Sequence, residues 1–86
     1  MTGPEAVKRA RHHVQGLTGK QPEAVIGLEK GDDGCWKVLV DVVELHRVPN
    51  TTDVLATYEV TLDDEGDLSG CRRLHRYVRG STQEER

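Results

Sequence analysis

Apolar residues recur at helical spacing near the start of this 86-residue chain. Val7, Ala10, Val14 and Leu17 stand three or four residues apart, which is the spacing that places side chains on one face of an α-helix. Thr2 precedes Glu5 by three residues, as in a capping box, and Pro4 suits a first helical turn. The pattern therefore predicts a helix from about Pro4 to Leu17.

The rest of the chain alternates strand-forming runs with turns. Four such runs cover residues 23–30, 35–47, 53–63 and 68–78. The turns Asp32-Asp33-Gly34 and Asp64-Glu65-Gly66 suit three-residue hairpin loops with glycine in the left-handed conformation. A segment from Val48 to Thr52, which contains Pro49, separates the two middle runs. The order predicts three consecutive β-hairpins.

These turns imply a strand register that the apolar pattern can test. The implied cross-strand pairs mostly join apolar residues: Leu28 with Val38, Ile26 with Val40, Ala24 with Val42, Leu45 with Leu55, Leu62 with Leu68, and Ala56 with Leu74. All three hairpins then place even-numbered residues on one face. That face collects Ala24, Ile26, Leu28, Trp36, Val38, Val40, Val42, Val54, Ala56, Tyr58, Val60, Leu62, Leu68 and Leu74.

An apolar sheet face and an apolar helix stripe can cover each other. The sequence therefore predicts an α+β fold in which the N-terminal helix packs on one face of a four-stranded antiparallel meander sheet (α-β-β-β-β). We expect residues 1–80 to form a single domain and residues 81–86 to form a flexible C-terminal tail, because their composition is polar.

The odd-numbered face of this sheet mixes apolar and charged residues. Exposed apolar residues that are rimmed by charge predict a partner or self-association surface, and a homodimer is one form of it. The alternative is a long strand that tolerates a few exposed aliphatic residues. The candidate partner-binding residues are Leu39, Asp41, Val43, Leu45, Arg47, Asp53, Leu55, Glu59, Arg73 and Tyr77.

Two charge relationships are expected within this face. Arg47 and Asp53 would form a cross-strand ion pair that brackets the Pro49 turn, although an exposed pair of this kind contributes only about 0–1 kcal/mol. Asp41 would face Glu59, a like-charge pair that is unfavourable without a cation. Arg73 could supply that cation within the fold, or a partner could supply it.

The net charge of −3 is unevenly distributed. Residues 1–22 carry a net charge of +3, residues 23–67 carry −9, and residues 68–86 carry +3. This layout can be neutralised inside the fold, when the terminal elements lie beside the acidic middle. It can also form a docking surface that carries both signs of charge.

Several functional classes have little support in the sequence. No run approaches the ~20 apolar residues of a membrane span, and no signal-peptide segment is present, so we expect a cytoplasmic protein without membrane contact. Catalytic motifs are absent and the histidines lack a ligand set, so no enzyme, metal or cofactor is predicted. Cys35 and Cys71 are widely spaced, and we expect both thiols to be free.

Nucleic acid binding is the main rival to protein binding. Arg72, Arg73, Arg76 and Arg79 surround Tyr77, and single-strand binders interleave basic and aromatic residues in this way. However, the isoelectric point is near 5.7 and the acidic middle would repel phosphate. Protein partners are therefore favoured.

One set of short motifs extends over roughly residues 16–80. It comprises Leu17-Thr18-Gly19, Gly34-x-Trp36, Val42-x-Glu44-x-x-Arg47-x-Pro49, Thr52-Asp53-Val54-Leu55-Ala56, Tyr58-Glu59-Val60, Leu62-Asp63-x-x-Gly66 and Arg76-Tyr77-x-Arg79-Gly80. In this order, the set resembles the gas vesicle protein O family. The resemblance implies a non-enzymatic accessory protein of gas vesicle assembly, located with the vesicles, whose partners are other accessory proteins or the shell subunit. A regulatory role in the expression of vesicle proteins is the alternative.

Overall fold

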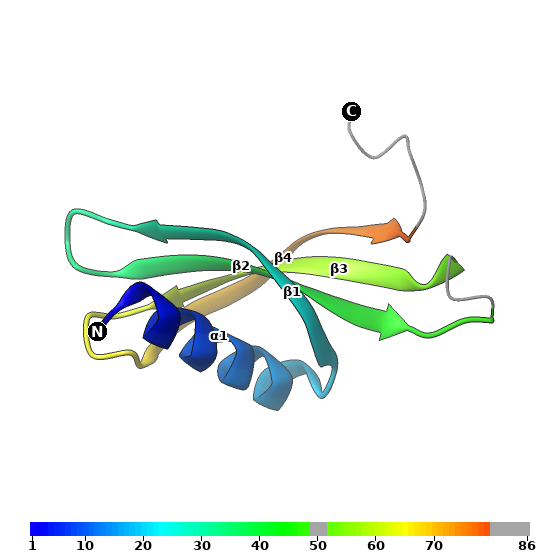
Figure 1. Ribbon diagram of the computed structural model, residues 1–86, viewed down its shortest axis with the longest axis horizontal. Coiled ribbons are helices and arrows are strands. Elements are labelled where there is room, and N and C mark those ends of the chain that lie inside the picture. The colour runs from blue at the N-terminus through cyan, green and yellow to red at the C-terminus, as the bar shows by residue number, and fades with distance from the viewer. Residues whose placement is uncertain (49–51, 80–86) are drawn as a thin grey trace.

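The chain forms one helix and a four-stranded antiparallel sheet, as the sequence predicted (Figure 1). The computed structural model describes residues 1–48 and 52–79. The elements follow the order α1 (Gly3–Thr18), β1 (Gln21–Lys30), β2 (Trp36–Leu45), β3 (Val54–Leu62) and β4 (Leu68–Val78). The strands pair in the order β1-β2-β3-β4, which is a meander. The predicted Pro49 turn and the predicted tail at residues 81–86 lie outside the described residues.

Local signals define both ends of α1. The Thr2 hydroxyl accepts a hydrogen bond from the Glu5 backbone N–H at 3.3 Å, which satisfies one of the free donors of the first turn. Gly19 adopts a left-handed conformation with φ of 70°, and its N–H donates to the Gln15 carbonyl at 2.8 Å. The predicted helix was therefore correct to within one residue at each end.

The helix packs on the sheet through Ala6, Ala10 and Val14, which are fully buried. This row is rotated from the predicted stripe: Val7 is half-buried, and Leu17 is 58% exposed. Residues four apart lie almost in line along a helix, so a sheet that faces Ala10 also faces Ala6 and Val14. Small side chains in this row allow α1 to lie close to the strands.

The sheet side of the core comes from even-numbered residues on the two central strands. Its fully buried members are Val38, Val40, Val42, Ala56, Val60 and Leu62, and the half-buried Val25, Trp36, Tyr58, Leu68 and Cys71 pack around them. Three residues predicted for this core are instead exposed: Ile26 by 55%, Leu28 by 44% and Leu74 by 41%. All three lie on the edge strands β1 and β4, where bulges displace Ile26 and Leu74 from the regular alternation.

Both glycine turns form as predicted and set the register beside them. Gly34 and Gly66 have φ of 86° and 90°. Leu28 therefore faces Val38, and Leu62 faces Leu68. The left-handed φ is what favours glycine at position 66, because the Arg9 side chain, which is 2.5 Å from the position of a Cβ atom there, is flexible and can move.

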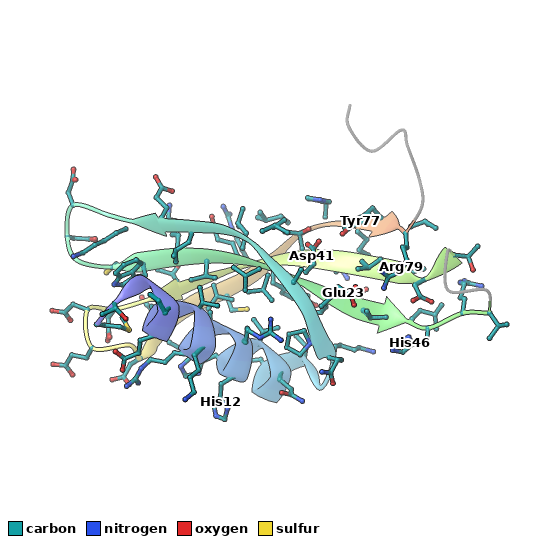
Figure 2. All side chains as sticks on the ribbon, viewed as in Figure 1. His12, Glu23, Asp41, His46, Tyr77 and Arg79 are labelled. Atoms are coloured by element: carbon teal, nitrogen blue, oxygen red, sulfur yellow. The ribbon has the colours of Figure 1, made fainter. Side chains whose placement is uncertain are left out.

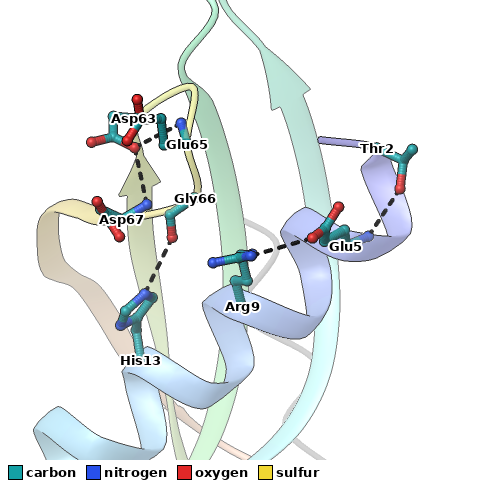
Figure 3. A network of polar contacts seen from close by, with 8 residues as sticks. All are labelled: Thr2, Glu5, Arg9, His13, Asp63, Glu65, Gly66 and Asp67. Carbon is teal, nitrogen blue, oxygen red and sulfur yellow. Dashed lines mark hydrogen bonds and ion pairs between the residues drawn. The ribbon is translucent and has the colours of Figure 1, made fainter.

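The second turn is also connected to the helix (Figure 3). The Asp63 carboxylate accepts hydrogen bonds from the backbone N–H groups of Glu65 and Asp67, both at 2.9 Å. His13 on α1 reaches the Gly66 carbonyl with Nε2 at 3.4 Å. His13 therefore connects the helix to the turn, whereas its neighbour His12 is exposed.

Farther from the turns, β-bulges change the register. Irregularities fall between Pro22 and Ala24 and between Val25 and Gly27 on β1, at Glu44 on β2, and at Ser69 and Leu74 on β4. Each bulge adds one residue to one strand only. The observed partners are therefore Val25 with Val40, Ala24 with Asp41, Val43 with Leu55, and Ala56 with Arg76, in place of the predicted pairs.

Candidate interaction surfaces

The sheet face opposite α1, called the open face below, is organised in rows across β2, β3 and β4. The rows are Leu39–Glu59–Arg72, Asp41–Thr57–His75 and Val43–Leu55–Tyr77. Asp41 thus faces Thr57, and the predicted Asp41–Glu59 pair is wrong. The register between β2 and β3 differs by two residues from the predicted one: the Leu45–Val54 pair beside the connection is shifted by one residue, and the bulge at Glu44 adds the second.

A buried carboxylate lies at the centre of the open face. Asp41 is 6% exposed, and its Oδ1 accepts a hydrogen bond from the Thr57 hydroxyl at 2.6 Å. Its Oδ2 accepts a hydrogen bond from the Tyr77 hydroxyl at 2.5 Å. His75 Nε2 lies 3.4 Å from the Thr57 hydroxyl oxygen and extends the network to the surface. Both hydrogen bonds to Asp41 therefore come from neutral groups.

The phenol of Tyr77 is held in its neutral form. Burial, the hydrogen bond to Asp41 and the negative charge of Asp41 together raise the pKa of Tyr77 to about 12. At neutral pH Tyr77 therefore remains a hydrogen-bond donor to the carboxylate.

Arg79 joins the two edges of the sheet, and we call this group of contacts the clasp. Its Nη1 lies 3.0 Å from Oε2 of Glu23 on β1, and its Nη2 lies 3.3 Å from Oδ2 of Asp53. The Arg79 backbone N–H donates to the Asp53 carbonyl at 2.7 Å. Figure 2 shows Glu23, Arg79, Asp41 and Tyr77 gathered in one region where β1 crosses the sheet.

The clasp also corrects the expected pairing of Asp53. Its Oδ1 accepts the backbone N–H of Arg47 at 2.6 Å, and His46 Nδ1 lies 3.8 Å from Oδ2. Within the described residues, the guanidinium that pairs with Asp53 is that of Arg79, not that of Arg47. Asp53 is 2% exposed, so its carboxylate is buried where it accepts the Arg47 N–H and joins the two ends of the 46–53 connection.

Part of the predicted partner surface is buried. Val43 is 5% exposed and Leu55 is 2% exposed, so the expectation that both are presented outward was wrong. Leu39 and Tyr77 are half-buried, and Glu59 pairs with Arg72 at 3.1 Å. Strand alternation predicted the face of these residues but not their burial.

Arg73 lies on the helix side of the sheet, not on the open face. The bulge at Leu74 places Arg73 opposite Tyr58 and Arg76 opposite Ala56. Both guanidinium groups contact the Glu44 carboxylate, at 3.6 and 2.9 Å, and the Tyr58 hydroxyl donates to the same carboxylate at 3.1 Å. The basic β4 therefore neutralises the acidic middle of the chain within the fold.

Exposed apolar side chains remain where the sheet extends past the helix (Figure 1). Leu45, Val54 and Val78 form a cross-strand row at the ends of β2, β3 and β4, which we call the distal row. Val54 is two residues from the buried Ala56, so the row lies on the helix side of the sheet. Leu45 is 46% exposed and Val78 is 43% exposed, because α1 ends before this point.

The described residues offer neither a metal-binding cluster nor a membrane-spanning helix. Across residues 1–48 and 52–79, histidine, cysteine and acidic side chains do not come together in threes that could bind a metal ion. In that same part of the chain, α1 is too short and too polar to cross a membrane.

Comparison with known proteins gives the family. The family model described as "Gas vesicle synthesis protein GvpO" matches residues 1–83. The chain belongs to the GvpO family. The resemblance read from the motifs is therefore confirmed.

Curated relatives in the GvpO family come from archaea and a bacterium. Gas vesicle protein O1 of Halobacterium salinarum is 45% identical over 80 residues, which are 93% of this chain and 66% of that protein. Gas vesicle protein O of a Streptomyces species is 53% identical over 64 residues, or 74% and 49% of the two chains. Gas vesicle protein O of Haloferax mediterranei is 37% identical over 81 residues, or 94% and 58%.

The chain spans between about half and two thirds of the length of these GvpO relatives. No solved structure matches it.

Sequence reasoning missed Thr57, His75 and Glu44 as members of these clusters. Thr57 and His75 are ordinary strand residues until the register places them in the row of Asp41. Glu44 could have been singled out, because it is an acidic residue among apolar ones on a predicted central strand. Its partners depend on the bulges at Glu44 itself and at Leu74, which the sequence pattern did not indicate.

Proposed function

We propose that this protein takes part in gas vesicle assembly as a non-catalytic accessory protein that binds other gas vesicle proteins. The match of the GvpO model to residues 1–83 carries the proposal, because it places nearly the whole chain in a family of gas vesicle synthesis proteins. The partner is the shell subunit or another accessory protein.

The distal row is the contact surface that the geometry favours. Its apolar side chains lie side by side on three strands, and Val48 just beyond β2 is fully exposed. A contiguous exposed apolar surface of this kind is typical of protein interfaces. Arg47, at the same end, and the half-buried Leu39 and Tyr77 remain candidate contacts from the predicted set.

The regulatory alternative, through nucleic acid, has less support. Arg72, Arg73, Arg76 and Arg79 each pair with a carboxylate of the same chain. A phosphate backbone would have to compete with these internal partners.

Vesicle formation in cells that lack their own copy of the protein tests the proposal. The double variant Leu45→Lys/Val78→Lys places charge in the distal row and should abolish vesicles while the circular dichroism spectrum stays native. Leu74→Lys is the matched control, since Leu74 is similarly exposed, at 41%, on the edge strand β4. Normal vesicles with the folded double variant would contradict the proposed surface.

A further inference from the structure

A cleft of about 280 Å³ opens beside the buried carboxylate of the open face. Its lining consists of Ile26, Asp41, Thr57, His75 and Tyr77, which come from all four strands. The bulge between Val25 and Gly27 directs Ile26 into this lining, although its even number predicted the helix side. Asp41 and Thr57 form the floor of the cleft, and Ile26, His75 and Tyr77 form its walls.

Among residues 1–48 and 52–79, the carboxylate on the floor has no cationic partner. Glu23, Glu44, Asp53 and Glu59 each pair with an arginine, whereas the described contacts of Asp41 are the hydroxyl groups of Thr57 and Tyr77. A carboxylate has about four acceptor positions, and these two donors use about half of them. Burying a charge is costly unless it is paired, so a cation supplied from outside would be favourable beside Asp41.

The walls suit the stem and head of a long basic side chain. The rings of His75 and Tyr77 lie with centroids 6.0 Å apart at an interplanar angle of 40°. Aromatic faces attract cations and also cover aliphatic stems. Ile26, which is 55% exposed, provides an apolar side to the entrance.

We propose that this cleft binds a lysine or arginine side chain of a protein partner, with the cationic head on the Asp41 carboxylate and the stem between Ile26 and the two rings. The proposal rests on the proposed function, because it names the chemistry by which a vesicle protein is recognised. It places this contact on the open face, separate from the distal row.

A metal ion fits the cleft less well than an organic cation. Calcium and magnesium require about six oxygen ligands, usually several of them charged, and the cleft offers one carboxylate. The acidic side chains of the two hairpin turns, such as Asp32 and Asp64, could attract cations without specificity, so the test must distinguish them.

Titration of the isotope-labelled protein with short peptides, followed by amide NMR shifts, tests the cleft directly. The probes are acetyl-Gly-Arg-Gly-amide and acetyl-Gly-Lys-Gly-amide, and the control is the neutral citrulline analogue of the first. We expect saturable shifts at Ile26, Thr57, His75 and Tyr77 with at least one charged peptide and none with citrulline. Shifts confined to residues 31–34 and 63–67, or no saturable shifts, would overturn the proposal.

Substitutions at two positions distinguish binding in the cleft from nonspecific electrostatic attraction of the charged peptide. Asp41→Asn removes the charge and keeps one acceptor oxygen for one of the two hydroxyl groups, while its NH2 group can donate to the other. It should weaken peptide binding at least about tenfold, as removal of a desolvated charge partner does. Ile26→Lys supplies an internal cation at the entrance and should block the peptide, whereas the neutral Ile26→Gln should not. Unchanged binding to both Asp41→Asn and Ile26→Lys would contradict the site.

The peptide titration does not depend on vesicle formation. Vesicles that are lost with Leu45→Lys/Val78→Lys, together with an absence of saturable peptide binding, would leave the proposed function intact and remove the cleft. Saturable binding that depends on Asp41, together with normal vesicles from every variant, would support the cleft and contradict the proposed function.

Discussion

Arg79 contacts Glu23 across the width of the sheet, with Nη1 3.0 Å from Oε2, although one residue follows β4 and the other belongs to β1. These strands are the two edges of the meander. The same guanidinium contacts the buried Asp53, so one side chain links both edges with the connection between the central strands.

The clasp should contribute measurably to stability. Asp53→Ala removes the acceptor of the Arg47 N–H and the buried partner of Arg79, and we expect a loss of about 2–4 kcal/mol in the free energy of unfolding. Asp64→Ala, in the exposed second hairpin turn, is the control and should change little. Urea denaturation followed by circular dichroism measures both, and equal stabilities would contradict the structural role of Asp53.

Two neighbouring residues of β2 should respond very differently to the same substitution. Val43→Lys forces a charge into a buried site and should destabilise the fold by about 3–4 kcal/mol, whereas Leu45→Lys should cost no more than about 1 kcal/mol. The difference follows from their exposures of 5% and 46%. Thermal unfolding of the two variants measures it, and a similar stability for both would show that the open face is not covered.

The Tyr77–Asp41 hydrogen bond predicts a loss of stability at high pH. The folded pKa of about 12 lies above the ordinary value of 10.0 for a tyrosine, so the folded state holds the phenolic proton more tightly. This contribution is fully present below pH 10 and is lost as the pH rises toward 12. Tyr77→Phe should flatten that part of the stability curve. Ultraviolet titration of the phenolates gives the pKa itself, and a Tyr77 value near 10 would refute the burial of the bond.

The cysteines should both be free and slow to react. Cys35 and Cys71 form no disulfide in the structure, as their spacing predicted. Burial, with the charge of Asp33 as a second cause, raises the pKa of Cys35, and burial raises that of Cys71. Since the thiolate is the reactive form, alkylation at neutral pH should be slower than for an unfolded control and should accelerate as the pH rises above 9.0. Rapid alkylation of either thiol at neutral pH would contradict this environment.

The sequence predicted the elements and the register next to the turns, because those features depend on local chemistry. Helical spacing and the Thr2 cap indicated α1, and Gly34 and Gly66 fixed the pairs nearest to them. Alternation also assigned Asp41, Val43 and Leu55 to the correct face.

The bulges and the contacts of the clasp were not predictable in the same way. The bulge at Glu44 accompanies contacts of its side chain with Tyr58 and Arg76, and such contacts exist only after folding. The clasp depends on a contact between Glu23 and Arg79, which are far apart in the chain. Local pattern carries no information on such a contact.

Affinity capture tests the central claim, that this protein binds other gas vesicle proteins through the distal row, most directly. Tagged protein is recovered from vesicle-forming cells, and the bound proteins are identified and quantified by mass spectrometry. We expect the unaltered protein and the Leu74→Lys control to capture the shell subunit or an accessory gas vesicle protein, and Leu45→Lys/Val78→Lys to retain less than about a tenth of it, as for loss of an interface hot spot. Capture of RNA or RNA polymerase in place of vesicle proteins, or equal capture by the double variant, would contradict the account.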